Sequence, residues 1–184
     1  MSNKEKKAPL SIITLGHPTL RKKAQELSVE EIKSKVVQQF IEDIQETLGN
    51  EKHGAALAAN QVDKLWQIIV IELENMSVKV LINPEVVKFS EKRDLAFEGC
   101  LSIPGYWGQV VRSEKIVVEA FNRKGEKIKI KASGFNARVI QHEIDHLSGI
   151  LFIERMEDWT TLITDEELAR RAEEQKKKEQ EENE

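Results

Sequence analysis

The chain has 184 residues, with 28 Lys and Arg, 32 Asp and Glu, four His and a single Cys. This length suits one domain, and a hydrophobic content of 40% is enough to build one core. A single cysteine excludes a scaffold held by internal disulfides and favours a reducing, cytoplasmic location. No apolar run approaches the roughly 18 residues that span a bilayer, so no membrane contact is expected. The net charge of −4 argues against nucleic-acid binding.

The charge is concentrated at one end of the chain. Residues 165–184 carry nine acidic and five basic side chains, a charge of −4 that equals the net charge of the whole protein. After Ala172 this segment has no apolar residue, so it has nothing to bury. We therefore predict a catalytic domain over residues 1–164 and a charged C-terminal tail, helical or disordered, over residues 165–184.

Hydrophobic periodicity predicts the elements in chain order. Ser28 and Glu31 form a capping box, which starts an amphipathic helix that Gly49 ends. β-Branched or alternating runs predict strands over residues 67–72, 79–82, 86–89, 110–121 and 127–131. A second helix is predicted over residues 136–147, closed by Gly149. Helices and strands without a regular βαβ alternation indicate a single α+β domain, with antiparallel or mixed sheets packed around the second helix.

The second helix contains a His-Glu-x-x-His motif. His142 and His146 are four residues apart and therefore lie on one helical face, where both imidazoles can reach one metal ion. Glu143 lies beside them and can accept a proton from a metal-activated water. Ile140, Ile144 and Leu147 form a separate apolar stripe, which favours a buried helix. Two buried His that only form hydrogen bonds are the alternative interpretation of the same pattern.

A hydrolytic metal site needs a third protein ligand. His17 and His53 lie in loops with Gly or Pro neighbours, which is typical of surface histidines. Cys100 follows a strand in an apolar segment, and a lone Cys is most often a small buried hydrophobe. A zinc protease would use a downstream acid, and Glu154 or Glu157 is available.

Three segments, in order, resemble the signatures of the peptide deformylase family. They are Glu98-Gly99-Cys100-Leu101-Ser102, Gln141-His142-Glu143-Ile144-Asp145-His146-Leu147, and the earlier Gly54-Ala55-Ala56-Leu57-Ala58-Ala59-Asn60-Gln61. The resemblance begins near residue 15, ends near residue 152, and omits both charged ends. It implies an amide hydrolase of protein biosynthesis that removes the N-formyl group from the initiator methionine of nascent peptides and releases formate.

The resemblance also implies roles for individual residues. Cys100, His142 and His146 would bind one Fe²⁺ ion, replaceable by Ni²⁺, Co²⁺ or Zn²⁺, with water as the fourth ligand. This water would attack the formyl carbon, with Glu143 as general base. Gln61 and the backbone N–H of Leu101 would form the oxyanion hole. The partners implied are formyl-methionyl nascent peptides and, through a transient contact, the ribosome.

Other residues are expected to line the substrate. The family pattern places Ala55, Ala56 and Gly99 along it, and the methionine side chain needs an apolar slot that Val139 and Phe135 can line. Arg21 and Arg138 are interpreted as surface or ion-paired residues without a chemical role.

The chain departs from the family pattern at two positions. Ala56 replaces a usual Gly, and Trp107 stands where several members have an Arg. A relative that has lost deformylation through these changes is therefore an alternative, although the motif Cys, both His, Glu143 and Gln61 are present. An HExxH protease is the other alternative.

Overall fold

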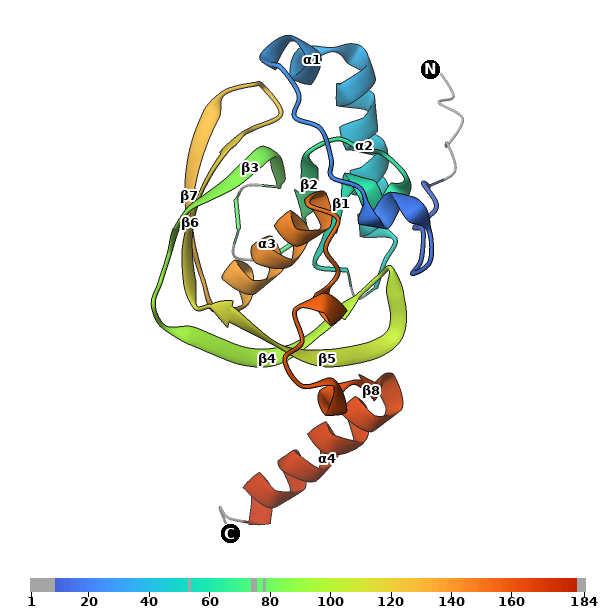
Figure 1. Ribbon diagram of the computed structural model, residues 1–184, viewed down its shortest axis with the longest axis vertical. Coiled ribbons are helices and arrows are strands. Elements are labelled where there is room, and N and C mark those ends of the chain that lie inside the picture. Colours follow the sequence, from blue (N-terminus) through green and yellow to red (C-terminus); the bar gives the residue numbers. More distant parts are fainter. Residues whose placement is uncertain (1–8, 53, 74–75, 78, 182–184) are drawn as a thin grey trace, which may run out of the picture.

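The computed structural model describes residues 9–52, 54–73, 76–77 and 79–181, and Figure 1 shows their arrangement. The prediction for His53 lies outside the described residues. A five-stranded antiparallel sheet has the order β1-β2-β3-β6-β7. Its strands are β1 (Ala56–Ala58), β2 (Ile68–Ile71), β3 (Val80–Phe89), β6 (Lys115–Phe121) and β7 (Lys127–Ser133). A second antiparallel sheet contains β4 (Arg93–Cys100), β5 (Ile103–Ser113) and β8 (Ile163–Thr164), in that order.

Four α-helices accompany the sheets in the described residues: α1 (Val29–Lys33), α2 (Lys35–Gly49), α3 (Gly134–Leu147) and α4 (Asp165–Glu181). Single turns of 3₁₀-helix lie at Pro18–Arg21, Ala59–Val62, Phe152–Glu154 and Trp159–Thr161. In Figure 1, α3 lies in the space enclosed by the two sheets, and it contacts strands of both. None of the described helices combines the length and the apolar character needed to cross a bilayer. The predicted α+β domain is confirmed.

The short strand β2 is buried on both faces and separates two parts of the core. Ile69 and Ile71 pack in a cluster with Ala137 and Ile140 of α3. The alternate residues, Ile68 and Val70, pack in a cluster that includes the apolar face of α2. Because successive side chains of a strand point to opposite faces, a continuous apolar run is what a strand between two helices requires.

The structure corrects several predicted boundaries. The capping box at Ser28 is present, but the helix that follows is interrupted at Ser34, which is extended (ψ 148°) and accepts a hydrogen bond from Val37 N. The two strands predicted over residues 79–89 are one strand with bulges. The strand predicted over residues 110–121 is two strands of different sheets, because the chain changes sheet at Glu114.

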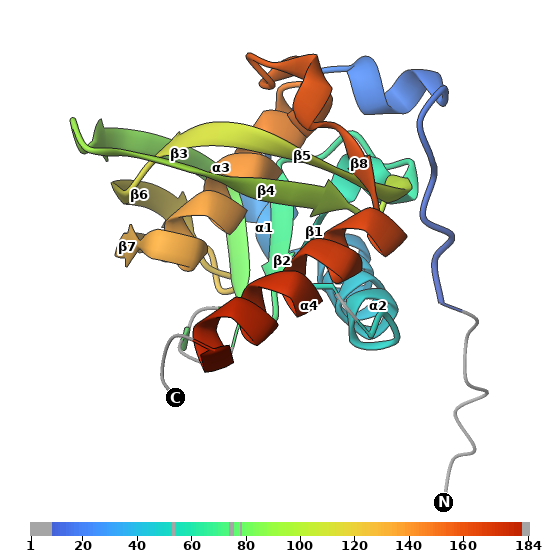
Figure 2. The same ribbon diagram turned by 90° about the horizontal axis from the view of Figure 1, so that it is seen from below.

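The C-terminal helix α4 extends away from the two sheets in Figure 1, and Figure 2 shows it from below, in front of them. It is joined to the second sheet at its first turn, where β8 pairs with β5 and Trp107 Nε1 donates a hydrogen bond to Asp165. Most of its side chains are exposed, as expected for a helix without an apolar face. The division of the chain after residue 164 stays a prediction.

We predict that Gly149 cannot be replaced without a large loss of stability. Gly149 has a φ of +76°, and a Cβ there would lie 2.6 Å from the backbone oxygen of Arg21. Gly149→Ala should therefore lower the free energy of unfolding by about 2–4 kcal/mol, because backbone strain and a steric clash add. The measurement is urea denaturation.

Gly134→Ala is the matched control, because Gly134 also has a positive φ (+55°) but its Cβ would meet no atom within 4 Å. Gly134→Ala should lower the free energy of unfolding by only about 1–2 kcal/mol, which is the cost of the positive φ without a clash. Equal losses for the two variants would contradict the clash.

Candidate metal centre

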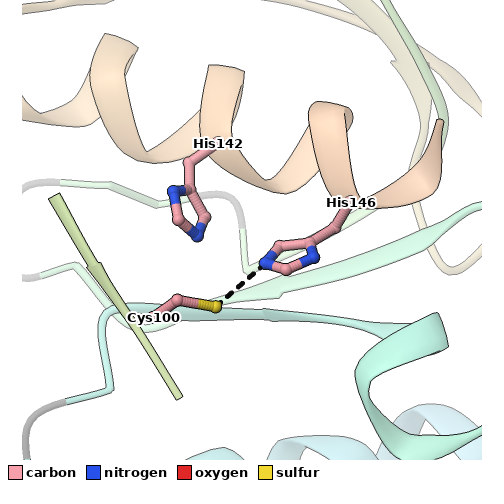
Figure 3. Close-up of side chains that lie close together, drawn as sticks. All are labelled: Cys100, His142 and His146. Atoms are coloured by element: carbon pink, nitrogen blue, oxygen red, sulfur yellow. Dashed lines mark hydrogen bonds between the residues drawn. The ribbon is translucent and has the colours of Figure 1, made fainter. Parts of the chain in front are cut away.

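Cys100, His142 and His146 converge in the interior of the domain (Figure 3). One potential ligand atom from each lies within 4.8 Å of the others, and Cys100 Sγ is 3.1 Å from His146 Nε2. Both histidines come from α3, and Cys100 ends β4. The helical spacing thus brings the imidazoles together, and the packing of α3 against the second sheet brings the thiol to them.

A buried carboxylate orients the first histidine. His142 Nδ1 donates a hydrogen bond of 2.9 Å to Glu98 Oε2, so its other nitrogen, Nε2, is left to face the cluster. Glu98 lies two residues before Cys100 on β4, and alternation along a strand places both on the face toward α3. Such an acceptor fixes the tautomer and ring orientation of a metal-binding histidine.

Two arginines hold Glu98 in turn. Arg112 donates to both of its carboxylate oxygens (2.9 and 3.0 Å), and Arg138 Nη1 donates to Oε1 (2.8 Å). Arg112 also donates to Asp145 of α3. Burial by itself would raise the pKa of Glu98, but the hydrogen bonds from His142 and Arg112 lower that pKa to about 2. Glu98 therefore stays ionised at any pH at which the protein would work.

Glu143 is buried next to the metal-ligand cluster. It is 4% exposed, and its Oε2 has no hydrogen-bond partner within the described residues. Burial raises its pKa to about 7, and the charge of Glu98 adds to the increase, although His142 opposes it. A carboxylate with such a pKa can take up and release a proton near neutral pH.

The two histidines differ in their readiness to bind a proton. Burial opposes protonation of His142, yet hydrogen bonds with Cys100 and Glu98 raise its pKa well above the ordinary value. Burial and the nearby charge of His142 lower the pKa of His146. The two opposite directions mean that the site disfavours two imidazolium ions at once, and that a proton bound there would lie on His142.

Gln61 is buried beside Cys100. Its Oε1 accepts a hydrogen bond from Ala58 N at 2.9 Å, which fixes the orientation of the amide. Its Nε2 donates to Ser102 Oγ (3.2 Å) and points toward Cys100 Sγ (3.5 Å). The backbone N–H of Leu101 has no acceptor within the described residues. Two donors therefore lie next to the cluster.

The donor set fits a metal ion. A thiol and two imidazoles are ligands of zinc and of divalent iron, cobalt and nickel, and three protein ligands leave a position for water. The carboxylate of Glu98, which accepts a hydrogen bond from His142 Nδ1, holds this imidazole in a fixed orientation, as a metal ligand requires. Asn60 Nδ2 in addition donates to the backbone oxygen of His146 and ties the end of α3 to the segment that carries Gln61.

The residues predicted to line the substrate differ in their burial. Ala56 and Val139 are buried and belong to the core cluster that includes α3, and Ala55 packs against it. Gly99 lies opposite Trp107, whose ring a Cβ at Gly99 would meet at 3.0 Å. Phe135, by contrast, is 63% exposed in the first turn of α3.

The departure at Ala56 causes no backbone strain. Among the described residues other than Gly, only Asp63 and Asn83 have a positive φ, so Ala56 adopts a conformation open to any residue. Trp107 packs on Gly99 and contacts α4, and the cationic side chain Arg112 is fully engaged with Glu98 and Asp145.

The other proposed third ligands lie elsewhere. Glu154 accepts hydrogen bonds from Arg21 and from Leu151 N, and Glu157 is exposed. His17 accepts a hydrogen bond from Thr19 N at the start of a 3₁₀ turn. The expectation that Arg138 is a surface or ion-paired residue is right only in its second part, because Arg138 is 5% exposed.

Comparison with known proteins agrees with the geometry. Residues 9–161 match the family model described as polypeptide deformylase. The peptide deformylase of Thermomicrobium roseum is 44% identical over 167 residues, which cover 85% of this chain and 92% of the relative. The chain belongs to the polypeptide deformylase family. The predicted resemblance is thereby confirmed.

Solved structures of deformylases share the fold. The crystal structure of peptide deformylase from Thermotoga maritima has a TM-score of 0.77 at 34% identity and covers 83% of this chain and all of that one. The Met-Ala-Ser-bound class I type b peptide deformylase from Acinetobacter baumannii has a TM-score of 0.75 at 34% identity, covering 81% of this chain and 99% of that one. The protein belongs to a family of metal-dependent hydrolases, and Cys100, His142 and His146 form a group that could hold the ion.

The raised pKa of Glu143 predicts a pH dependence of stability in protein stripped of divalent ions. A carboxyl group with a folded-state pKa of about 7 binds its proton more tightly than the unfolded chain does, whose pKa is near 4.5. The free energy of unfolding should therefore fall as the pH rises from 4.5 to 7, by up to about 3 kcal/mol from this group. Urea unfolding in the presence of a chelator, at a series of pH values, measures the slope.

Glu143→Gln has the shape of the protonated side chain and cannot titrate. In this variant the decrease in the free energy of unfolding between pH 4.5 and pH 7 should be smaller by the contribution of Glu143, up to about 3 kcal/mol. Parallel pH profiles for the two proteins would contradict the raised pKa.

Proposed function

We propose that the cluster around Cys100, with Glu143 and Gln61, hydrolyses the N-formyl amide of formyl-methionyl peptides and releases formate. The observation that carries this proposal is the meeting, in one buried place, of three metal-ligand atoms, a carboxylate with a pKa of about 7 and two hydrogen-bond donors. Membership of the deformylase family supports the reaction and its substrate class.

Cys100, His142 and His146 would hold one divalent ion. When bound, the ion would supply a Lewis acid that polarises the formyl carbonyl and lowers the pKa of water. We propose Fe²⁺ as the ion, with Ni²⁺, Co²⁺ or Zn²⁺ as replacements, because a thiolate with two imidazoles suits these borderline cations. Glu98 would hold the His142 ring in place throughout.

Glu143 would act first as general base and then as general acid. Its Oε2, which has no hydrogen-bond partner within the described residues, can accept a proton from the attacking water. The same proton can pass to the amine nitrogen as the carbon–nitrogen bond breaks, which leaves formate and a free N-terminus. A pKa of about 7 makes both transfers accessible near neutral pH.

Gln61 and Leu101 would stabilise the oxyanion of the tetrahedral intermediate. Gln61 Nε2 is held beside Cys100 by the hydrogen bond from Ala58 N to its own oxygen, so its direction is set before the reaction. The N–H of Leu101, which has no acceptor in the part of the chain that the structure describes, is the second donor. Preorganised donors of this kind cost no reorganisation when charge develops.

The peptide would lie along β1. Within the described residues this strand is at the edge of its sheet and pairs with β2 alone, so one side of its backbone can accept an extended peptide. We assign Ala55, Ala56, Gly99 and Val139 to the substrate surface, with the exposed Phe135 at its margin. In the A. baumannii relative the bound molecule is Met-Ala-Ser.

The same substrate suggests where the protein works. Formyl-methionyl chains are nascent peptides, so we propose a cytoplasmic enzyme that meets them during synthesis and contacts the ribosome transiently. The acidic tail gives no support to an electrostatic contact with RNA.

Replacement of the thiol should remove the metal. We expect Cys100→Ser to lose most of its bound ion, because a neutral hydroxyl is a far weaker ligand than a thiolate. The measurement is the metal content per chain after dialysis against a weak chelator. Ser102→Ala, which alters the neighbouring hydroxyl but no ligand, should retain its ion. Full retention in Cys100→Ser would show that the third ligand lies elsewhere.

Formate release tests the reaction directly. Protein purified without oxygen and loaded with Fe²⁺ or Ni²⁺ should release formate from formyl-Met-Ala-Ser. Glu143→Gln should lower kcat by about 10²–10⁴, and Gln61→Leu by about 10²–10³ with a smaller change in KM. Both variants should keep their metal.

Two outcomes would reject the proposal. The first is a metal-loaded wild-type protein that releases no more formate than Glu143→Gln. The second is cleavage of casein without formate release, which would favour the HExxH protease.

A further inference from the structure

A cavity of about 320 Å³ lies against a face of α3 other than the one that carries the metal-cluster histidines. Gln141, Ile144 and Asp145 form its α3 wall, whereas His142 and His146 belong to the cluster and do not line the cavity. The remaining walls come from both sheets and from the segment after α3: Val86, Phe89, Arg93, Val111, Arg112 and Arg155. Arg112 and Asp145 also belong to the charge network around Glu98, but no proposed metal ligand, general base or oxyanion donor lines the cavity.

Half of the lining is apolar and incompletely covered. Val86, Val111 and Ile144 are half-buried, and Phe89 is 53% exposed at the end of β3. These four side chains belong to three elements that meet at the same place: β3, β5 and α3. They present an apolar surface that the described part of the chain leaves open to solvent.

The side-chain acceptors in the polar half of the lining already have partners. Both oxygens of Asp145 already accept from Arg155, and one accepts from Arg112 as well. Gln141 exchanges hydrogen bonds with the backbone of Ser113 and donates to Ala137 O. The side-chain acceptors in the wall are therefore all engaged.

Two cationic groups keep donors to spare. Arg155 binds Asp145 through Nε and Nη2, which leaves Nη1. Arg93 is exposed at the start of β4, and its guanidinium has no hydrogen bond or ion pair within the described residues. With three arginines and one aspartate, the lining has an excess of positive charge.

We propose that this cavity binds a small organic anion, with an apolar body against Val86, Val111 and Ile144 and a carboxylate at Arg93 and Arg155. A cation would meet two arginines and side-chain acceptors that already have partners, and an inorganic anion would leave the apolar walls without a partner. A guanidinium fork matches the two oxygens of a carboxylate. The volume suits a ligand with one ring or a short branched chain.

Titration with 3-phenylpropionate tests the site. We would record methyl NMR spectra of the zinc-loaded protein, labelled at Ile, Leu and Val. Saturable shifts of the Val86, Val111 and Ile144 methyl groups are expected, with a Kd on the order of 1 mM, as is typical of a fragment of this size. The uncharged analogue 3-phenylpropionamide should bind at least about tenfold more weakly, since it lacks the charge-assisted hydrogen bonds.

Arg93→Gln should weaken binding of the carboxylate about three- to tenfold. Lys92→Gln is the matched control, because Lys92 is the neighbouring exposed cation, pairs with Glu114 and does not line the cavity. It should leave the affinity unchanged. Val86→Trp, which fills the cavity, should abolish the shifts at Val111 and Ile144.

Three results would overturn the proposal. The first is shifts confined to the Leu101 and Val139 methyl groups, which would place the carboxylate at the metal centre. The second is equal affinity of the protein for the acid and for the amide. The third is equal affinity of the Arg93→Gln and Lys92→Gln variants for the acid. Since every readout is a methyl shift or an affinity, these results are independent of whether formate is released.

Discussion

The hydrogen bond between Glu98 and His142 is the interaction on which the metal centre depends. It joins the strand that carries Cys100 to the helix that carries both histidines. Arg112 and Arg138 neutralise the buried carboxylate, and Arg112 reaches Asp145 on the same helix. Breaking a buried charge pair by removing one partner typically costs about 3–5 kcal/mol. The register of β4 against α3 is thus held by charges that only this arrangement satisfies.

The fold places α3, the helix that carries both histidines, where water has little access. Strand β2 carries apolar side chains on both faces, so that α2 packs on one side and α3 on the other. The low polarity around α3 explains why Glu143 binds its proton near neutral pH and why the charge of Glu98 must be paired. The same low polarity therefore raises the pKa of Glu143 and makes it necessary for Arg112 and Arg138 to neutralise Glu98.

Much of the site could be predicted from the sequence, because its motifs are local. The helical spacing of His142 and His146 and the capping box at Ser28 follow from the backbone geometry of a helix. The roles of Glu98, Asp145 and Arg138 were missed, although alternation along β4 puts Glu98 on the same face as Cys100. The helix break at Ser34 was also missed, because the apolar pattern of the sequence continues from α1 into α2. Ser34 itself only caps α2.

The sequence was sufficient for the family, for the α+β class and for the pair of histidines, because motif order and helical periodicity are properties of the chain alone. The family resemblance implied that Cys100 joins the two histidines, but local patterns left Glu154 and Glu157 open, and the tertiary structure was needed to place Cys100 beside His146, 46 residues away, and the two acids elsewhere. The tertiary structure alone also revealed the cavity beside α3, whose walls come from β3, β4, β5 and the segment after α3. The physical reason is that distances between segments far apart in sequence are set by how sheets and helices pack, and no local pattern encodes them.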